Sequence, residues 1–240
     1  MSAAPRLSAT YFLDVLSSWC HWAEPAWQAL RQRYGDAVSF QWKIALMDPA
    51  GIPANRGQCD WFYRRSGVIT RANHRLSSAW LVEGVRDYSA PNLVAEAARD
   101  LGADDDRARL AMAHAAMVEG QRVDQIAMAA RIAALATGLD ADLLAAHAAT
   151  DAVLRRVKET TDEFVHLGAT QRPTFVLEND IGDRAVLSGF HGFDPLAAAI
   201  DALLADSQAY ASWEVHFGST PTRDDADAGD GCIKAPPTRR

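Results

Sequence analysis

The chain has 240 residues, of which 49% are hydrophobic and 23% are charged, as is ordinary for a globular protein. Its formal net charge of -7 argues against a nucleic-acid partner or an anionic membrane surface. The first ten residues contain no apolar run of signal-peptide length, and no later stretch is long and apolar enough to span a bilayer. We therefore expect a cytoplasmic protein.

The cysteines also restrict the kind of site. Cys20, Cys59 and Cys232 form no C-x-x-C pair, and no histidine pair has metal-ligand spacing, so we expect no metal site. An odd number of cysteines in a reducing compartment indicates free thiols.

The first predicted unit is a strand that leads directly into a helix. Tyr11-Phe12-Leu13 is apolar and β-prone, and from Ser17 onward the apolar residues, beginning with Trp19, Cys20 and Trp22, recur at helical spacing as far as Gly35. Ser17 is a good N-cap, because its hydroxyl can accept a bond from a first-turn amide. The positive end of this helix would stabilise an anionic thiolate placed over Ser17.

A second strand is predicted over residues 38–46, followed by a loop at 47–53, which completes a β-α-β unit with a right-handed crossover. A short helix is predicted at 59–65, where aromatic residues precede Arg64-Arg65. Arg71, His74 and Arg75 follow it. This basic cluster in an acidic chain has two open interpretations, a solvated surface or an anion-binding site.

The stretch from Ala90 to Leu167 is rich in alanine and predicts an all-helical insertion, longer than a connecting loop. Aspartates mark helix starts and glycines mark helix ends. The expected helices lie near 91–101, 105–119, 123–137, 140–149 and 150–167.

The last part of the chain predicts a hairpin and a helix. Pro173 opens a strand, a turn at 179–183 leads to a second strand at 184–188, and Asp194 caps a helix with Pro195 at its first position that ends near Asp206. A further short helix is expected within 207–217. From Gly218 the composition is typical of a disordered tail.

This element order and two segments resemble the DsbA-like thioredoxin-fold superfamily. That superfamily includes FrnE-like oxidoreductases, kappa-class glutathione transferases and 2-hydroxychromene-2-carboxylate isomerases. Its FrnE-like members carry an Asp, two residues and then C-P-W-C, whereas this chain reads DVLSSWC from Asp14 to Cys20. A serine replaces the first cysteine in the kappa and isomerase members, as Ser17 does here. The segment from Gly168 to Phe175 matches the Gly-x-x-x-x-Pro-Thr-Phe pattern.

The resemblance implies an α/β thioredoxin-like fold with a large helical insertion between its β-α-β and β-β-α halves. The thioredoxin-like domain would comprise 8–53 and 168–206, with the connecting segment and insertion at 54–167 and the tail at 218–240. Pro173 would be a cis-proline that faces Ser17 and Cys20. The kappa-like relatives also imply a homodimer.

The same resemblance implies how a ligand binds. Ser17 would orient the thiolate of glutathione, which is the expected cofactor. The backbone before Pro173, together with Thr174, would hold a peptide-like ligand by strand addition. Arg172 would contact an anion or point into solvent. Trp19 and Trp22 would line the core or wall an apolar pocket between the two parts of the fold.

Three functions stay open on the sequence. The leading hypothesis is a glutathione-dependent isomerase or transferase that lacks a C-x-x-C pair and acts on a small-molecule or peptide-like thiol substrate. The second is a thiol-disulfide oxidoreductase homologue that uses Cys20 alone, although the favoured interpretation of Cys20 is a buried apolar side chain. The third is a non-catalytic peptide-binding module.

One loop departs from the kappa-class pattern. Kappa members carry Gly-Ser-Asp after the last strand to hold the γ-glutamyl end, and this chain reads Gly189-Phe190-His191. An aromatic ring and an imidazole cannot replace an acidic contact to an ammonium group. His191 would be an acid or base of the site, or a surface residue.

Overall fold

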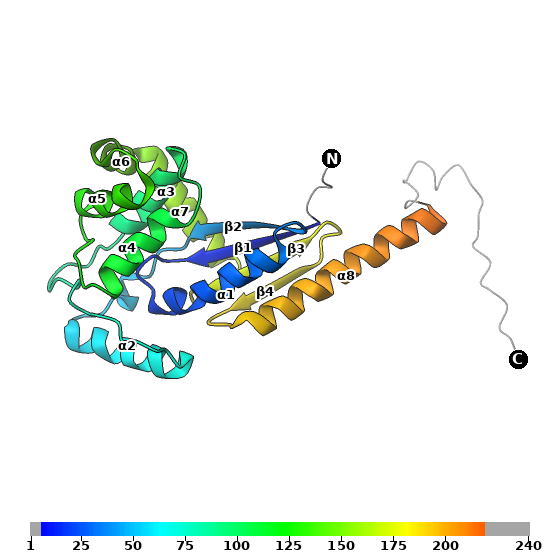
Figure 1. Ribbon diagram of the computed structural model, residues 1–240, viewed down its shortest axis with the longest axis horizontal. Helices are drawn as coiled ribbons and strands as arrows, with labels where there is room; N and C mark the ends of the chain where they lie inside the picture. The colour runs from blue at the N-terminus through cyan, green and yellow to red at the C-terminus, as the bar shows by residue number, and fades with distance from the viewer. Residues whose placement is uncertain (1–5, 219–240) are drawn as a thin grey trace, which may run out of the picture.

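A computed structural model describes residues 6–218 and is organised around a four-stranded mixed sheet (Figure 1). The strand order is β2-β1-β3-β4. β1 pairs in parallel with β2, and β3 is antiparallel to both of its neighbours. This is the α/β thioredoxin-like fold that the sequence predicts. The strands are β1 (Leu7–Leu13), β2 (Val38–Ile44), β3 (Thr174–Asn179) and β4 (Arg184–Ser188).

Alternation along β1 assigns one helix layer to each face of the sheet. Tyr11 points to α1 (Ser18–Tyr34), where its ring lies 5.1 Å from that of Trp27. Phe12 points to the opposite face, where its ring lies 6.0 Å from that of Phe164 on α7 (Asp151–His166). The first strand begins at Leu7, four residues before the predicted apolar run, and α1 begins where Ser17 predicts it.

The predicted helical insertion is present at one end of the sheet (Figure 1). Each predicted helix is confirmed, with boundaries that shift by up to three residues. Gly102, Gly120 and Gly138 follow helices with φ of 93°, 73° and 80°, a region that favours glycine, so the helices stop there. The insertion consists of α3 (Ala90–Asp100), α4 (Arg107–Met117), α5 (Ile126–Thr137), α6 (Ala141–Ala148) and α7.

The connecting segment holds a longer helix than the sequence predicts. α2 runs from Arg56 to Thr70, because Asn55 caps it by accepting a 2.9 Å bond from the Gln58 amide. The predicted helix at 59–65 is therefore only its middle. A 3₁₀ turn, η1 (Pro49–Gly51), lies within the loop predicted at 47–53.

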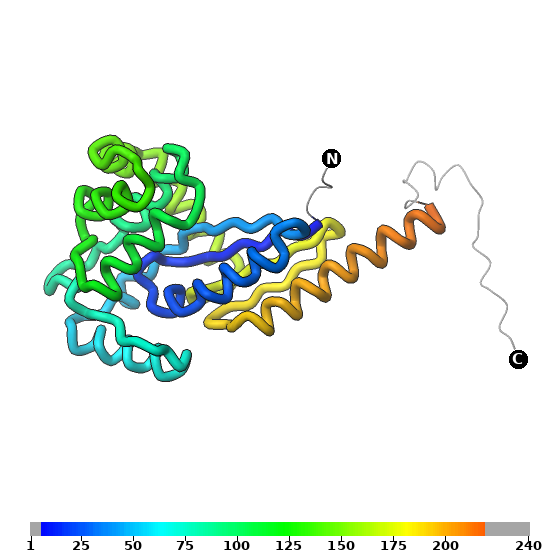
Figure 2. The backbone as a smooth tube through the Cα atoms, in the orientation of Figure 1, coloured from blue at the N-terminus to red at the C-terminus, as the bar shows by residue number. Residues whose placement is uncertain are grey.

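The C-terminal helix also differs from the prediction. α8 (Phe193–Phe217) is one continuous helix rather than a helix to Asp206 and a second short one. Its N-cap is Gly192, and Asp194 lies within the first turn without capping it. Its C-terminal half projects beyond the end of the sheet (Figure 2). The tail predicted after Gly218 lies outside the described residues.

Most buried apolar residues form one large cluster that runs from the sheet into the helical insertion, and a smaller cluster around Phe12 and Phe164 lies on the other face of the sheet. The division into two domains therefore stays a prediction. Within residues 6–218, no helix is long and apolar enough to cross a membrane. The same described part of the chain contains no group of three His, Cys, Asp or Glu side chains arranged to hold a metal ion.

Candidate active site

Ser17 lies at the junction between β1 and α1. Its backbone is extended, its N–H donates a 3.0 Å bond to the Asp14 carbonyl, and its hydroxyl accepts a 3.4 Å bond from the Cys20 amide. The predicted N-cap is confirmed. Because the hydroxyl accepts this bond with a lone pair, its proton stays available for a second partner.

A cavity of about 340 Å³ opens over Ser17. This volume falls within the size range of small-molecule sites. The start of α1, the loop after β2, α2 and the segment before Pro173 all contribute to its walls. Its lining includes Ser17, Ser18, Trp19, Phe62, Arg65 and Gln171.

The bond between Arg172 and Pro173 is cis, as the resemblance predicts. The Pro173 carbonyl accepts a 2.8 Å bond from the Gly189 amide, which ties the loop after β4 to this turn. Within the described part of the chain, the backbone N–H and C=O of Arg172 have no hydrogen-bond partner. Both groups are free to pair with an extended ligand, as strand addition requires.

The Arg172 side chain is half-buried and lines the cavity, so it does not point freely into solvent, and its contact with an anion stays a prediction. Its guanidinium donates to the carbonyls of Ala45, at 2.5 Å, and of Leu46, and lies 4.4 Å from the Phe164 ring centre. Burial lowers the pKa of this guanidinium, and the nearby Asp14 carboxylate opposes that shift. Arg172 therefore holds the cis-proline turn against the end of β2.

Cys20 lies beneath the cavity and is not part of its lining. Its side chain is buried, and its carbonyl accepts a 3.1 Å bond from the Tyr11 hydroxyl. Burial raises the pKa of the Cys20 thiol to about 12, and the neighbouring Ser17 hydroxyl only partly opposes this. The thiol is therefore protonated at neutral pH and does not face the cavity.

Asp14 connects the turn between β1 and α1 to the loop after β2. Its two carboxylate oxygens each accept a 2.9 Å backbone bond, one from Leu16 and one from Met47. Burial raises the pKa of this carboxyl, and those two amides oppose the rise. Asp14 thus holds the β1–α1 turn to the loop after β2, which sets the position of Ser17.

The other predicted site residues divide into two groups. Trp19 lines the cavity, and its ring lies 6.1 Å from that of Phe190 in the loop that also carries His191. Trp22 is outside the cavity and donates a 3.1 Å bond to the Ser66 hydroxyl of α2. Thr174 is fully buried, and its hydroxyl bonds to the Gln171 carbonyl at 2.6 Å. His191 is half-buried and lies outside the cavity lining.

Helix α2 contributes to this site in a way that the sequence does not predict. Phe62, Tyr63 and Arg65 all line the cavity. The Arg65 guanidinium lies 5.8 Å from the Trp19 ring centre and 5.6 Å from that of Phe62. It lies nearest to the ring of Trp61, at 5.0 Å, and so places a positive charge beside the aromatic wall of the cavity. The aromatic run before Arg64-Arg65 was the available signal, but the sequence does not show that α2 folds over Ser17.

Comparison with known proteins identifies the class of protein that this fold and site define. The chain matches the family described as DSBA-like thioredoxin domain over residues 10–201. It belongs to that family. No curated protein sequence matches it significantly.

Several solved structures share the fold. The cytosolic disulfide reductase DsbM from Pseudomonas aeruginosa has 23% sequence identity and a TM-score of 0.66, covering 82% of this chain and 98% of its own. The 2-hydroxychromene-2-carboxylate isomerase has 17% identity and a TM-score of 0.56, covering 85% and 98%. The oxidoreductase DsbA from Xylella fastidiosa has 18% identity and a TM-score of 0.57, covering 86% and 88%. The fold family thus includes both oxidoreductases and an isomerase.

Proposed function

We propose that this protein is a glutathione-dependent isomerase or transferase that works without a C-x-x-C pair. One observation carries the proposal: the Ser17 hydroxyl lines a cavity beside the unpaired backbone of Arg172, while Cys20 is buried beneath it. A site with a hydroxyl at a helix N-terminus and no exposed thiol suits a thiol that arrives with the ligand.

In this proposal the Ser17 hydroxyl donates a hydrogen bond to the glutathione sulfur, which has lost its proton to solvent. The helix N-terminus and the Arg65 guanidinium favour the negative charge. The thiolate forms a carbon–sulfur bond to an electrophilic carbon of the substrate. Either a leaving group departs with the electrons of the bond that breaks, or a carbon–carbon π bond opens and the carbanion formed takes a proton from solvent. In a transferase the carbon–sulfur bond stays in the product, and in an isomerase it breaks again and glutathione leaves unchanged.

The Arg172 backbone would hold the peptide part of glutathione. A structure of DsbM from Pseudomonas aeruginosa, 22% identical with a TM-score of 0.64, is described as a complex with GSH. The Phe190-His191 loop offers no acidic group to the γ-glutamyl ammonium, so the proposal predicts weaker binding than an acidic loop would give.

Cytoplasmic localisation is also part of the proposal. It is supported by the buried free thiols Cys20 and Cys59 and by the cytosolic description of DsbM. The burial of Cys20 disfavours the alternative of an oxidoreductase that uses this thiol alone. A non-catalytic peptide-binding module would use the same Arg172 backbone, and turnover distinguishes it from the enzyme.

Calorimetric titration with reduced glutathione tests the proposal. We expect Ser17→Ala to weaken binding roughly tenfold to a hundredfold, because a hydrogen bond to a charged group contributes about 1.5–3 kcal/mol. The matched control is Asp140→Ala, which removes a comparable N-cap from α6 far from the cavity. It should lower stability by about 1 kcal/mol and leave binding unchanged. Absence of binding to the wild type, or equal binding by Ser17→Ala, would refute the proposal.

A further inference from the structure

A second and larger cavity lies on the other side of α2. It has a volume of about 540 Å³, is open to solvent on one side and is lined by α2 and the segment that follows it, over residues 60–76. Tyr63 is the residue that lines both cavities, so α2 forms a wall between them. The proposed function makes no use of this second cavity.

Three arginines surround this cavity. Arg64, Arg71 and Arg75 line it together with His74, and Asp60 is its one acidic residue. The lining therefore has two positive charges in excess. Among residues 6–218, none of these three guanidinium groups lies within ion-pair distance of a carboxylate. The Asp60 carboxylate likewise has no cationic side chain within ion-pair distance in that part of the chain.

Carboxylates are abundant in this chain, whose net charge is -7. Several arginines elsewhere in residues 6–218 pair with them, whereas others, such as Arg131, do not. For example, Arg109 pairs with Glu24 at 2.5 Å, Arg156 with Asp100 at 2.7 Å and Arg122 with Asp124 at 2.8 Å. The three arginines of the second cavity are thus left with their donors free for an external anion.

The backbone at Arg71 supports the same conclusion. Arg71 ends α2 with φ of 56°, and within the described residues it is the one non-glycine residue with positive φ. Eight other positions with positive φ are glycines. A glycine would end the helix at Arg71 without steric cost. An arginine at this strained backbone position therefore indicates that its side chain has a functional role.

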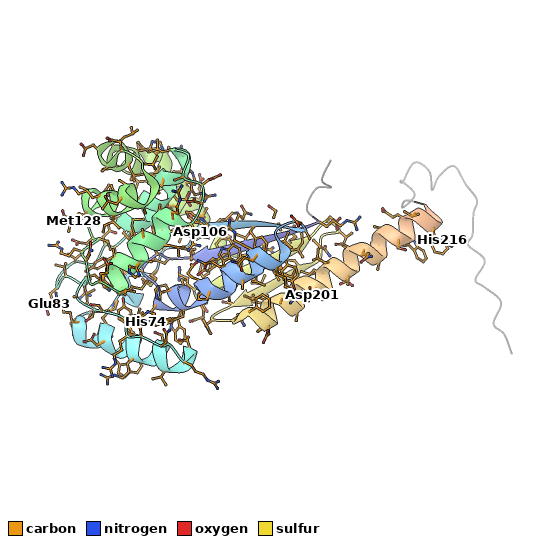
Figure 3. The ribbon with its side chains drawn as sticks, viewed as in Figure 1. His74, Glu83, Asp106, Met128, Asp201 and His216 are labelled. Atoms are coloured by element: carbon orange, nitrogen blue, oxygen red, sulfur yellow. The ribbon has the colours of Figure 1, made fainter. Side chains whose placement is uncertain are left out.

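The segment that carries these residues is anchored against α1. The His74 ring, labelled in Figure 3, lies 5.0 Å from the Trp22 ring and 5.9 Å from that of His21. Tyr63 and Leu76 are buried at the cavity floor, and Val68 adds an exposed apolar wall. The cavity therefore combines an apolar floor with a cationic rim.

We propose that this cavity binds the phosphate group of a small molecule, with Arg64, Arg71 and Arg75 as its ligands. Guanidinium groups present forked donors that match phosphate oxygens, and three of them with an imidazole exceed what one carboxylate can use. The apolar floor provides contact area for an organic group attached to the phosphate. The site goes beyond the glutathione chemistry proposed for Ser17.

Calorimetry at constant ionic strength in chloride tests this site with phenyl phosphate, inorganic phosphate and citrate as probes. We expect saturable binding of phenyl phosphate that weakens at least tenfold in Arg71→Gly and in the Arg64→Gln/Arg75→Gln double variant. Arg71→Gly removes the side chain and relieves the backbone, so its unfolding midpoint should be unchanged or higher. Misfolding then cannot explain a loss of binding.

Two controls complete the experiment. Arg131→Gln removes an exposed arginine of α5 that has no ion pair within residues 6–218, and it should bind phenyl phosphate as the wild type does. Ser17→Ala should also bind it normally, so this site and the glutathione site can fail independently.

The probes separate the sources of the phosphate. Tighter binding of phenyl phosphate than of inorganic phosphate assigns an organic phosphate, and equal affinities assign free phosphate. Citrate binding as tight as that of phenyl phosphate would overturn the assignment to phosphate. No saturable binding, or binding that the arginine variants leave unchanged, would overturn the site itself.

Discussion

Ser17 and Cys20, at the start of α1, have different environments. Ser17 and Cys20 are three residues apart and connected by one hydrogen bond, yet only Ser17 lines the cavity. Cys20 faces the interior, because positions that lie one turn into α1 pack against the sheet. Its thiol is kept protonated by burial, which disfavours the thiolate that disulfide exchange needs.

Thiol labelling tests this difference at the scale of the residue. In a Cys232→Ser background, a chromogenic disulfide should leave the native protein unlabelled at pH 8, because both Cys20 and Cys59 are buried. Both thiols should react at once in urea. Rapid labelling of Cys20 in the native state would contradict its burial and would revive the single-cysteine oxidoreductase.

The raised pKa also predicts a pH dependence of stability. The folded state holds the Cys20 proton up to about pH 12, whereas the unfolded thiol loses it near pH 9. Its contribution to the free energy of unfolding is therefore complete below pH 9 and is lost as pH rises toward 12. Urea unfolding across this range should show a smaller decline for Cys20→Ala than for the wild type. Equal declines would mean that Cys20 is not the group responsible.

At the scale of the element, α8 carries an apolar stripe longer than the sheet it covers. Leu196, Ile200 and Leu203 are buried against the sheet layer. The same helical face continues through Tyr210 and Phe217, flanked by Trp213, where these side chains are 59%, 64% and 60% exposed. Aromatic side chains bury roughly 150–250 Å² each, so three of them provide much of the ~800 Å² per partner of a standard interface.

We propose that this end of α8 pairs with its copy in a homodimer, because identical stripes are self-complementary. Light scattering should give a dimer mass for the wild type and a monomer mass for the Trp213→Gln/Phe217→Gln double variant. Leu135→Gln is the control, because it changes a leucine of α5 that is 90% exposed and lies outside this stripe, and this variant should remain dimeric. A monomeric wild type at tens of micromolar would rule out this interface.

At the scale of the molecule, a buried ion pair joins the sheet layer to the helical insertion. Arg109 of α4 bonds to both carboxylate oxygens of Glu24 on α1, at 2.5 and 3.0 Å, and to Asp106 at 2.9 Å. Asp106, labelled in Figure 3, also pairs with Arg31 of α1. These contacts hold α1, and with it Ser17, in a fixed relation to the insertion.

Breaking this pair should be costly. Arg109→Met leaves Glu24 buried without its partner and should lower the free energy of unfolding by about 3–5 kcal/mol in urea titrations. The Glu24→Leu/Arg109→Met double variant should recover a large part of that loss, since no uncompensated charge stays buried. The exposed Lys158–Asp162 pair is the control, and Lys158→Met should leave the free energy of unfolding nearly unchanged, because water screens an exposed ion pair. A comparable small loss for Arg109→Met would show that the junction does not depend on this pair.

Local rules were sufficient for most elements of this chain. The N-cap at Ser17, the glycines that end α4 and α5, and the proline that opens β3 each act through neighbouring backbone groups, so their effects can be predicted from sequence. The helices of the insertion are predictable from sequence for the same reason. The continuous helix α8 is not predictable in this way, because nothing in the local sequence marks whether a helix stops at Asp206 or extends past the sheet.

The site depended on contacts between distant residues. The sequence by itself determined the thioredoxin-like fold, the loss of the cysteine pair and the position of Ser17. Only the tertiary structure placed Cys20 beneath the cavity, turned Arg172 onto the carbonyls after β2 and folded α2 over Ser17. The physical reason is that burial, and the pKa and pairing that depend on it, are set by side chains tens of residues away in the chain.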